Sequence, residues 1–310
     1  MKLKWQKLGH VFNHSTKSEW IEDSALTPTP ILLDEDRIRV YCGFRDRQGV
    51  SRIGYVDVSA KDPSIILKVS DKPSLDIGSD GAFDDNGVIL GDVIRVENGI
   101  LRMYYVGFQL VKKAKFLAFS GVAESADNGE TFQRKSNVPI LDRSDEGLTI
   151  NAIHSVIKEK NKWRIWYAAG NDWQEIAGVS YPKYNIRYTE SFDGLTIDLT
   201  SVNELCVDVE GDEYRIGRPS VFKINKVYIM FYTKGGITGK DYFPGVAYSE
   251  DGVNWKRNDE CFGLTMSEDG FDSIHLCYPR LITVGSRVFC FYNGNYMGKE
   301  GFGVAELLDA

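Results

Sequence analysis

Apolar and polar residues alternate in short segments along the whole chain, and one order of segments recurs five times. In each repeat an apolar segment is followed by a polar turn and then by a segment of alternating apolar and aromatic residues. These second segments are residues 37–43, 101–107, 162–170, 226–232 and 287–294. Such alternation, with β-branched and aromatic residues, predicts strands. Because the repeats are about 60 residues apart, the pattern predicts an all-β, five-bladed β-propeller with four antiparallel strands per blade.

The repeat extends from Pro28 to Leu307 without a Pro-rich or Ser-rich linker. We therefore expect a single domain over residues 1–310. The last repeat supplies only three predicted strands after Leu276, and the segment Trp5–Phe12 is the natural fourth. We expect this N-terminal strand to close the last blade, because the pairing would remove an exposed sheet edge.

Composition narrows the class of protein. Of the 310 residues, 43% are hydrophobic, which is enough for a buried core. The net charge of −7 argues against nucleic acid or an anionic membrane as a partner. No stretch reaches the roughly 18 consecutive apolar residues of a membrane span, and no apolar segment of a signal peptide follows the basic N-terminal residues.

The five cysteines are odd in number, and Cys42 and Cys290 fall in apolar strands. Both observations favour reduced thiols and predict a cytoplasmic location. No cysteine pair has the spacing of a metal site, and we expect neither a metal nor another cofactor.

A propeller concentrates function in the central channel, where the first strand of each blade lies. Aligning these inner strands on their apolar ends matches Thr29-Pro30, Gly91-Asp92, His154-Ser155, Pro219-Ser220 and Pro279-Arg280. The polar residues at or just before these positions are Asp84, Asp85, Asp92, Asn151, His154, Glu213, Arg215, Arg218, His275, Tyr278 and Arg280. Apolar strands do not need such residues at their entrances, so their recurrence predicts a shared polar pocket.

The second strands bring further polar residues to the same mouth. They are Arg45, Asp46, Gln109, Asn171, Asp172, Trp173, Lys234, Asn293, Asn295 and Tyr296. Trp173 and Tyr296 are candidates for an aromatic platform under a ligand. Arg45, Arg218, Lys234 and Arg280 make this set cationic in an acidic protein. We therefore expect a small anionic ligand, which could be phosphorylated, nucleotide-linked or acidic.

Asp84, Asp85, Asp92 and Glu213 are the candidate catalytic carboxylates. Two carboxyl groups can divide general acid–base work, in which one protonates a leaving oxygen and the second acts as base or nucleophile. Each of these carboxylates, and each candidate histidine, also has a purely structural interpretation. Asp84 and Asp85 also fit a solvated acidic turn, Asp92 a hydrogen-bonded structural aspartate, and Glu213 a surface ion pair with Arg215. His154 and His275 also fit structural histidines.

Three segments carry a family resemblance. Gly91–Ile94 is similar to the segment of glycoside hydrolase family 43 whose Asp adjusts the pKa of the catalytic acid. Gly217–Phe222 and Tyr278–Ile282 are similar to segments of the family 130 mannoside phosphorylases and mannosidases. On these segments and the blade pattern, the chain resembles the five-bladed carbohydrate-active propellers of glycoside hydrolase families 43, 32, 68 and 130. The resemblance implies a saccharide substrate, which would stack on Trp173 and Tyr296 and which the cationic set predicts to be a phosphorylated, nucleotide-linked or acidic sugar. It also implies that Arg280 helps to bind phosphate or substrate.

The chain also departs from that pattern. Thr27–Pro30 stands where families 43 and 32 open the first blade with an Asp, and the fourth-blade catalytic Glu of family 43 falls near Arg218, with Glu213 as the nearest acid. The leading interpretation is an enzyme that cleaves or transfers a glycosidic bond, by hydrolysis or phosphorolysis. The alternative is a propeller that binds sugar without catalysis. A third, sialidase-like interpretation follows from Tyr214–Gly217, which is similar to the Phe/Tyr-Arg-Ile-Pro motif of a six-bladed family.

Overall fold

Strands dominate the computed structural model, which describes residues 2–13, 18–224, 226–238 and 241–309. The all-β prediction is confirmed. In those ranges the helical elements are two 3₁₀ turns, Glu97–Gly99 and Asp259–Cys261, and the short helix α1 (Asn295–Gly298). None of them has the length and hydropathy of a membrane-crossing helix.

The described strands pair into five antiparallel units of four strands each, which we call units 1 to 5. Unit 1 consists of β2 (Asp23–Asp34), β3 (Arg37–Arg45), β4 (Ser51–Ser59) and β5 (Ile66–Val69). Unit 2 consists of β6 (Val88–Arg95), β7 (Leu101–Gln109), β8 (Leu117–Ser125) and β9 (Gln133–Arg134). Unit 3 consists of β10 (Ile150–Glu159), β11 (Lys162–Ile176), β12 (Val179–Ser191) and β13 (Glu204–Val207).

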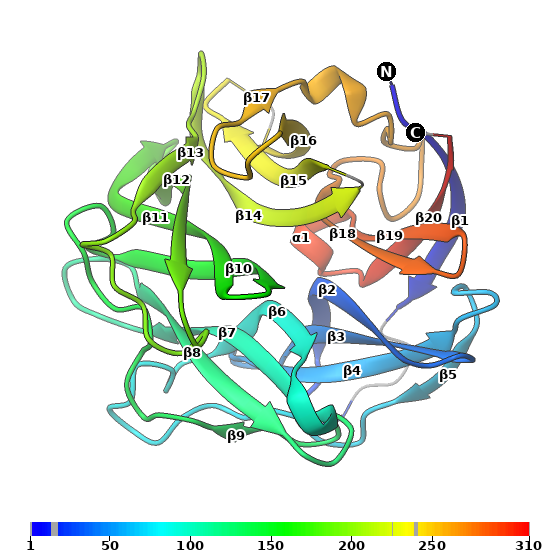
Figure 1. Ribbon diagram of the computed structural model, residues 1–310, viewed down its shortest axis with the longest axis horizontal. Helices are drawn as coiled ribbons and strands as arrows, with labels where there is room; N and C mark the ends of the chain where they lie inside the picture. The colour runs from blue at the N-terminus through cyan, green and yellow to red at the C-terminus, as the bar shows by residue number, and fades with distance from the viewer. Residues whose placement is uncertain (1, 14–17, 225, 239–240, 310) are drawn as a thin grey trace.

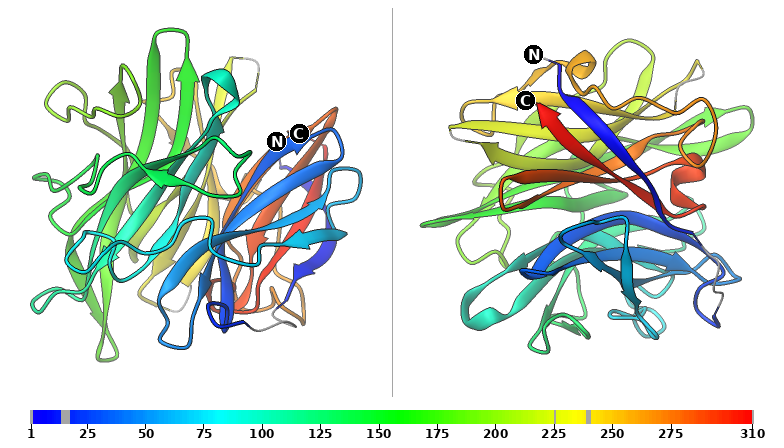
Figure 2. Two further views of the ribbon diagram at one scale, coloured as in Figure 1. Left: turned by 90° about the horizontal axis from the view of Figure 1, so that it is seen from below. Right: turned by 90° about the vertical axis from the view of Figure 1, so that its right-hand side faces the viewer.

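Unit 4 consists of β14 (Glu213–Ile224), β15 (Val227–Gly236), β16 (Asp241–Ser249) and β17 (Lys256–Arg257). Unit 5 joins the two ends of the chain: β18 (Cys277–Val284), β19 (Arg287–Asn293) and β20 (Phe302–Asp309) are completed by β1 (Lys4–Phe12). β1 pairs with β20 from Trp5 opposite Leu307 to Phe12 opposite Phe302, as expected from the sequence. Figure 2 shows these two terminal strands side by side.

The five units surround a common centre (Figure 1). Their first strands, β2, β6, β10, β14 and β18, lie innermost, and each contacts the first strand of the next unit, with β18 contacting β2. Short parallel bridges between β8 and β10 and between β12 and β14 also join units 2, 3 and 4. The first strands thus form a closed ring about the centre.

The hydrophobic core is divided among the spaces between neighbouring units. One buried cluster, for example, packs Val40 and Phe44 of unit 1 against Phe289, Phe302 and Val304 of unit 5. Burying these side chains contributes about 1.5–3 kcal/mol each. Since each cluster draws on two units, no unit can bury its apolar faces alone.

Buried aromatic residues of the second strands hold neighbouring units together at repeated turns. Tyr41 donates its hydroxyl to Gly129 O at 2.9 Å, and Tyr104 donates to Gly194 O at 2.8 Å. Both glycines have positive φ, and a Cβ on Gly129 would lie 2.0 Å from the Tyr41 hydroxyl. Glycine is therefore required where one unit reaches the turn of the next.

Candidate functional site at the centre of the ring

All five inner strands contain one extra residue at the same height of the ring. The register shifts fall between Leu26 and Thr29, Leu90 and Asp92, Ile153 and Ser155, Gly217 and Ser220, and Cys277 and Arg280. These bulges agree with the sequence alignment in units 2 to 5. In unit 1 the alignment was wrong by one residue, because the bulge includes Pro28 rather than Pro30.

Three of the bulges hold a non-glycine residue in the left-handed region. Thr27, Arg218 and Tyr278 have φ of 56°, 57° and 55°, and each precedes a proline. This conformation costs about 1–2 kcal/mol per residue and persists only where the surroundings enforce it. A bulge re-aims the side chain that it carries, and here Arg218 and Tyr278 line cavities at the centre of the ring.

Two arginines cross the ring and close its centre. Arg218 of unit 4 donates from one nitrogen to Leu90 O of unit 2 at 2.6 Å and to His154 Nδ1 of unit 3 at 3.0 Å. Arg280 of unit 5 donates to His154 O at 2.8 Å and forms an ion pair with Asp92. Except for the bond from Arg218 to His154, these contacts link units that are not neighbours, so the channel has a polar floor instead of an open bore.

Asp92 belongs to this floor. It is 4% exposed, its Oδ1 accepts from Val93 N at 2.8 Å, and its Oδ2 accepts from Val156 N at 2.7 Å. With Arg280 also bound, both carboxylate oxygens are occupied. Asp92 therefore acts as a structural aspartate that joins three units, which was one of the two interpretations of its sequence position.

Two connected cavities lie beside this floor. The larger one, which we call the central cup, has a volume of about 630 Å³, and the smaller one, the inner chamber, about 150 Å³. Both are lined by Ile89, Phe108, Phe116, Pro182, Tyr242 and Tyr278. A third cavity, of about 10 Å³, lies at the bulges among Thr27, Ser220 and Arg280. That volume suits a single water molecule.

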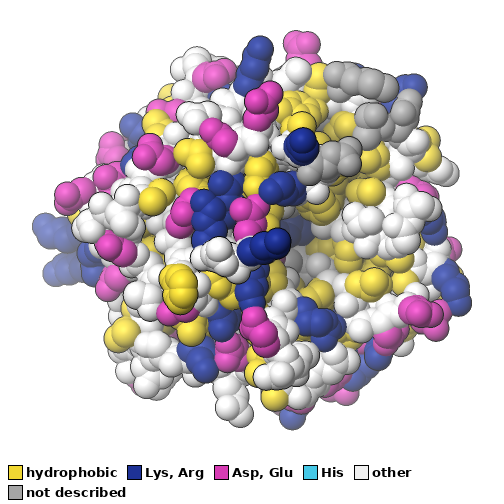
Figure 3. Space-filling model, in the orientation of Figure 1, with side chains coloured by type: hydrophobic (Ala, Val, Ile, Leu, Met, Phe, Trp, Pro, Cys, Tyr) yellow, Lys and Arg dark blue, Asp and Glu magenta, His cyan; other side chains and the backbone are white. Residues whose placement is uncertain are grey.

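The cup and chamber are cationic and aromatic. Their basic side chains are Arg45, Lys115, Arg215 and Arg218, accompanied by His154 and His275. Among the described residues that line either cavity, none is Asp or Glu. Figure 3 shows one face of the ring hollowed near its centre, with Lys and Arg side chains around the hollow.

Arg45 and Arg218 carry charges that the described protein does not balance. Arg45 Nε is buried without a hydrogen-bond partner. Burial, together with the nearby charge of Arg280, lowers the pKa of Arg218 to about 10. A buried cation without a carboxylate partner is costly, and an anionic ligand group would offset that cost. Arg215 is held differently, since its guanidinium lies 4.2 Å from the centre of the Tyr242 ring and 4.8 Å from that of Tyr214.

His154 is neutral at the floor. Burial, and then the charges of Arg218 and Arg280, hold its pKa well below the usual value of 6.5. Because a guanidinium can only donate, His154 Nδ1 accepts from Arg218 and the ring proton lies on Nε2. His154 thus lines the inner chamber as a neutral ring.

The candidate carboxylates Asp84 and Asp85 lie outside these cavities. Asp84 is buried and bound to Arg134, with 2.8 Å between its Oδ2 and Arg134 Nε. Asp85 Oδ2 accepts from Gly81 N at 2.9 Å, which fixes a surface turn. The expectation that these residues enter the central pocket was wrong, because segment 78–87 folds back on itself, with Gly78 N bonded to Asp84 O at 3.0 Å.

Glu213 and Lys234 belong to an ionic network in unit 4 and do not line the cup. Glu213 accepts from both terminal nitrogens of Arg257 at 2.8 Å and from Lys234 at 2.9 Å. Lys234 also binds Asp259 at 2.5 Å. Although burial raises the pKa of Glu213, its bonds to Arg257 and Lys234 outweigh that effect and lower it. Glu213 does form an ion pair, but with Arg257 and Lys234.

The remaining candidates divide between turns and the cup. Asp46 accepts from Val50 N at 3.0 Å, and Asn171 accepts from Leu148 N at 2.6 Å, so both hold turns. Trp173 packs edge-on against Phe116, with 5.1 Å between ring centres. His275 lines the cup, and its Nδ1 accepts from Tyr296 N at 2.9 Å. The expected residues that line the three central cavities are Arg45, His154, Arg215, Arg218, His275, Tyr278, Arg280 and Tyr296.

The sequence alignment missed Lys115, Tyr181 and Tyr242, which also line the cup. Lys115 lies in the loop between β7 and β8, and Tyr181 lies in the hairpin of β11 and β12. Those two strands have 15 and 13 residues, so they extend beyond the repeated pattern. The extra length of this hairpin was the signal available in the sequence. No group of three or more His, Cys, Asp or Glu side chains in the described ranges is placed to hold a metal ion.

Comparison with known proteins supports the fold. No protein-family model matches the chain. Among solved structures, a glycoside hydrolase superposes with a TM-score of 0.74 at 17% identity, over 100% of this chain and 93% of that one. A structure described as a complex of BT0996 with RGII has a TM-score of 0.71 at 18% identity, over 99% of this chain and 91% of that one. A family 130 structure, described as targeting β-1,2-mannosidic linkages in Candida mannan, has a TM-score of 0.70 at 13% identity, over 99% and 94%.

Sequence relatives are of two kinds. A β-1,2-mannobiose phosphorylase of Thermoanaerobacter is 30% identical over 135 residues, which span 40% of this chain and 44% of that protein. The uncharacterized protein Rv1502 of Mycobacterium tuberculosis is 31% identical over 306 residues, 98% of this chain and 99% of the relative. The chain therefore has the fold of the glycoside hydrolases and family 130 mannoside phosphorylases, and it belongs to the family of Rv1502.

Proposed function

We propose that the chain is a single-domain, five-bladed β-propeller that binds an anionic saccharide in the central cup. Units 1 to 5 are the blades, and β1 closes the last of them. The ring of inner strands and the likeness to glycoside hydrolase structures support this architecture. A saccharide ligand is supported by the same likeness and by the segment shared with a mannobiose phosphorylase.

The observation that carries the ligand assignment is that the cup and the inner chamber together have four basic side chains and no Asp or Glu among their described lining residues. Arg218, at the base of the inner chamber, has two hydrogen bonds to neutral acceptors. A phosphate or carboxylate group of the ligand would form charge-assisted hydrogen bonds with it. Phe108, Phe116 and Tyr242 would pack against the C–H faces of the sugar ring.

A reaction on the glycosidic bond is the second part of the proposal. Hydrolysis by paired carboxylates needs two acids about 5 Å or roughly 6.5–9.5 Å apart across the bond, and the described lining offers none. Transfer of a glycosyl group to or from phosphate fits this lining better than hydrolysis does, because Arg45 and Arg218 would hold the phosphate oxygens. The occupied carboxylate of Asp92 favours the alternative, a propeller that binds the sugar without turnover.

We also propose that the protein works in the cytoplasm. All five cysteines are free, and Cys42, Cys277 and Cys290 are buried. Reduced thiols are typical of a reducing compartment.

Titration calorimetry with matched sugars tests the ligand assignment. We expect mannose 6-phosphate or glucuronic acid to bind more tightly than mannose or glucose, and the preference to be lost in Arg45→Gln and Arg218→Gln. Arg95→Gln, which removes an exposed arginine at the far end of β6, is the matched control. Equal affinity for the neutral and anionic sugars, or equal loss in the control, would refute the assignment.

Turnover is measured on a glycoside panel with and without phosphate. Products that appear only with phosphate would support transfer. Saturable binding without any product would favour the binding-only alternative. Phosphate-independent hydrolysis would contradict the preference for transfer over paired-carboxylate hydrolysis.

A further inference from the structure

An exposed tyrosine separates the central cup from a second cavity at the edge of unit 5. This outer pocket has a volume of about 640 Å³ and is lined by His10, Asn13, Tyr296, Lys299 and Glu300. Tyr296 also lines the central cup. Its side chain therefore stands on the boundary between two cavities, each of a size that accommodates a drug-sized ligand.

Tyr296 is held in place by a strained and well-bonded turn. Tyr296 and Met297 have φ of 54° and 60°, which non-glycine residues rarely adopt. Tyr296 N donates to His275 Nδ1 at 2.9 Å, and Asn295 Oδ1 accepts from Ile274 N at 2.7 Å. Tyr296 is nevertheless 52% exposed. Strain of this kind in a braced turn is typical of functional sites, and here the braced backbone carries an aromatic residue that is exposed to solvent.

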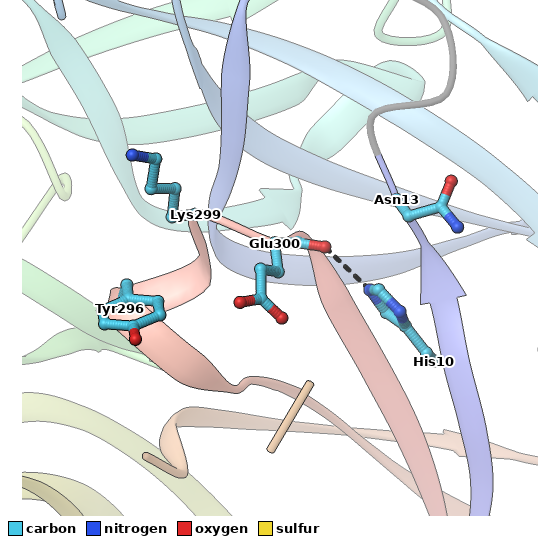
Figure 4. Close-up of a pocket in the computed structure, with 5 residues that line it drawn as sticks. All are labelled: His10, Asn13, Tyr296, Lys299 and Glu300. Carbon is cyan, nitrogen blue, oxygen red and sulfur yellow. Dashed lines mark hydrogen bonds between the residues drawn. The ribbon is translucent and has the colours of Figure 1, made fainter. Parts of the chain in front are cut away.

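The outer pocket offers groups that suit sugar hydroxyls. Figure 4 shows the Glu300 side chain between Tyr296 and His10, with Lys299 and Asn13 on either side. His10 is fixed by stacking on Phe271, with 4.4 Å between ring centres, and by a bond of 2.8 Å between its Nε2 and Glu300 O. Carboxylate, ammonium and amide side chains together can both accept and donate hydrogen bonds. Unlike the cup, this pocket contains a carboxylate as well as a cation.

From this arrangement we propose that the ligand is an oligosaccharide whose anionic sugar occupies the central cup and whose next sugars cross Tyr296 into the outer pocket. This inference rests on the proposed function, because it takes the anionic sugar in the cup as given. Tyr296 supplies a stacking face for the sugar at the crossing. Glu300 and Lys299 bind hydroxyl groups of the sugar beyond it. A single sugar would leave the outer pocket unused.

A chain-length series measured by calorimetry tests the inference. The probes are glucuronic acid with aldobiouronic and aldotriouronic acids, and mannose 6-phosphate with pentamannose 6-phosphate, so that each longer member keeps one anionic group. We expect the longer member of at least one series to bind about fivefold to tenfold more tightly than the monosaccharide. Tyr296→Ala should remove that gain, and Tyr296→Phe should keep it, because stacking needs the ring and not the hydroxyl.

Phe192→Ala is the matched control, since it removes an aromatic ring that is 87% exposed elsewhere on the molecule. Melting curves of all variants show that they are folded. Equal affinity along both series, or an unchanged gain in Tyr296→Ala, overturns the inference while the proposed function stands. If the anionic monosaccharides bind no better than neutral sugars and the longer probes also fail to bind, the proposed function fails and the inference fails with it.

Discussion

Replacing Arg218 with Gln should stabilise the protein while weakening anion binding. Burial in the folded protein lowers the pKa of this guanidinium from 12.5 to about 10. At neutral pH this lowered pKa means that burying the charged guanidinium destabilises the folded protein by about 3 kcal/mol. Gln removes that cost but loses bonds to Leu90 O and His154, worth about 1–2 kcal/mol together. We therefore expect a net gain of about 1–2 kcal/mol, or roughly 2–4 °C in Tm.

Urea unfolding and thermal melting of wild type and variant provide the assay, with Arg95→Gln as the control for loss of one positive charge. Repeating the melts in phosphate and in chloride at equal ionic strength separates binding from screening. Wild type should gain about 2.7 kcal/mol at a phosphate concentration 100 times its Kd, and the variant should gain much less. A variant that loses more than about 2 kcal/mol would refute the view that the Arg218 charge is unbalanced.

Three other predictions follow from the same contacts. Burial lowers the pKa of His154 in the folded protein, so below pH 6.5 the unfolded chain binds a proton that the folded protein does not. Wild type should therefore lose stability relative to His154→Gln as the pH falls, by up to about 1.4 kcal/mol per pH unit. Parallel curves of unfolding free energy against pH for the two proteins would contradict this. Asp84→Asn should lower the free energy of unfolding by about 3 kcal/mol, because it leaves the Arg134 charge without its carboxylate partner, and it should leave saccharide affinity unchanged. A loss of affinity without a loss of stability would show that Asp84 belongs to the binding site. Deleting residues 2–12 should lower Tm sharply in one cooperative step, since β20 loses its partner strand; an unchanged melting curve would show that β1 is dispensable.

The repeated strands could be predicted because alternation is a local property of the sequence. The second strands begin at Arg37, Leu101, Lys162, Val227 and Arg287, within one residue of the expected positions. The pairing of β1 with β20 was also predictable, because the last repeat was one strand short. The alignment of unit 1 failed because Thr-Pro occurs twice in succession at residues 27–30, and only the left-handed conformation of Thr27 shows which pair forms the bulge.

The candidate site was only partly predictable, because ionic partners are distant in sequence. Asp84 and Arg134 are 50 residues apart, and Glu213 and Arg257 are 44 apart. Without the fold, a carboxylate neutralised by such a partner looks the same as a catalytic one. Arg218 and Tyr278 were identified because each stands just before an aligned position of an inner strand, where the structure shows the bulge.

The central claim is that the cup is an anion site. Anomalous diffraction from crystals soaked in tungstate, a heavy analogue of phosphate, tests it most directly. We expect a tungsten peak in the inner chamber or cup about 4 Å from a guanidinium nitrogen of Arg218 or Arg45, because a tungstate oxygen that accepts from that nitrogen lies about 3 Å from it, and no such peak in crystals of the double variant Arg45→Gln, Arg218→Gln. Peaks confined to the outer surface of the ring, with the cup unoccupied at saturating tungstate, would contradict the account.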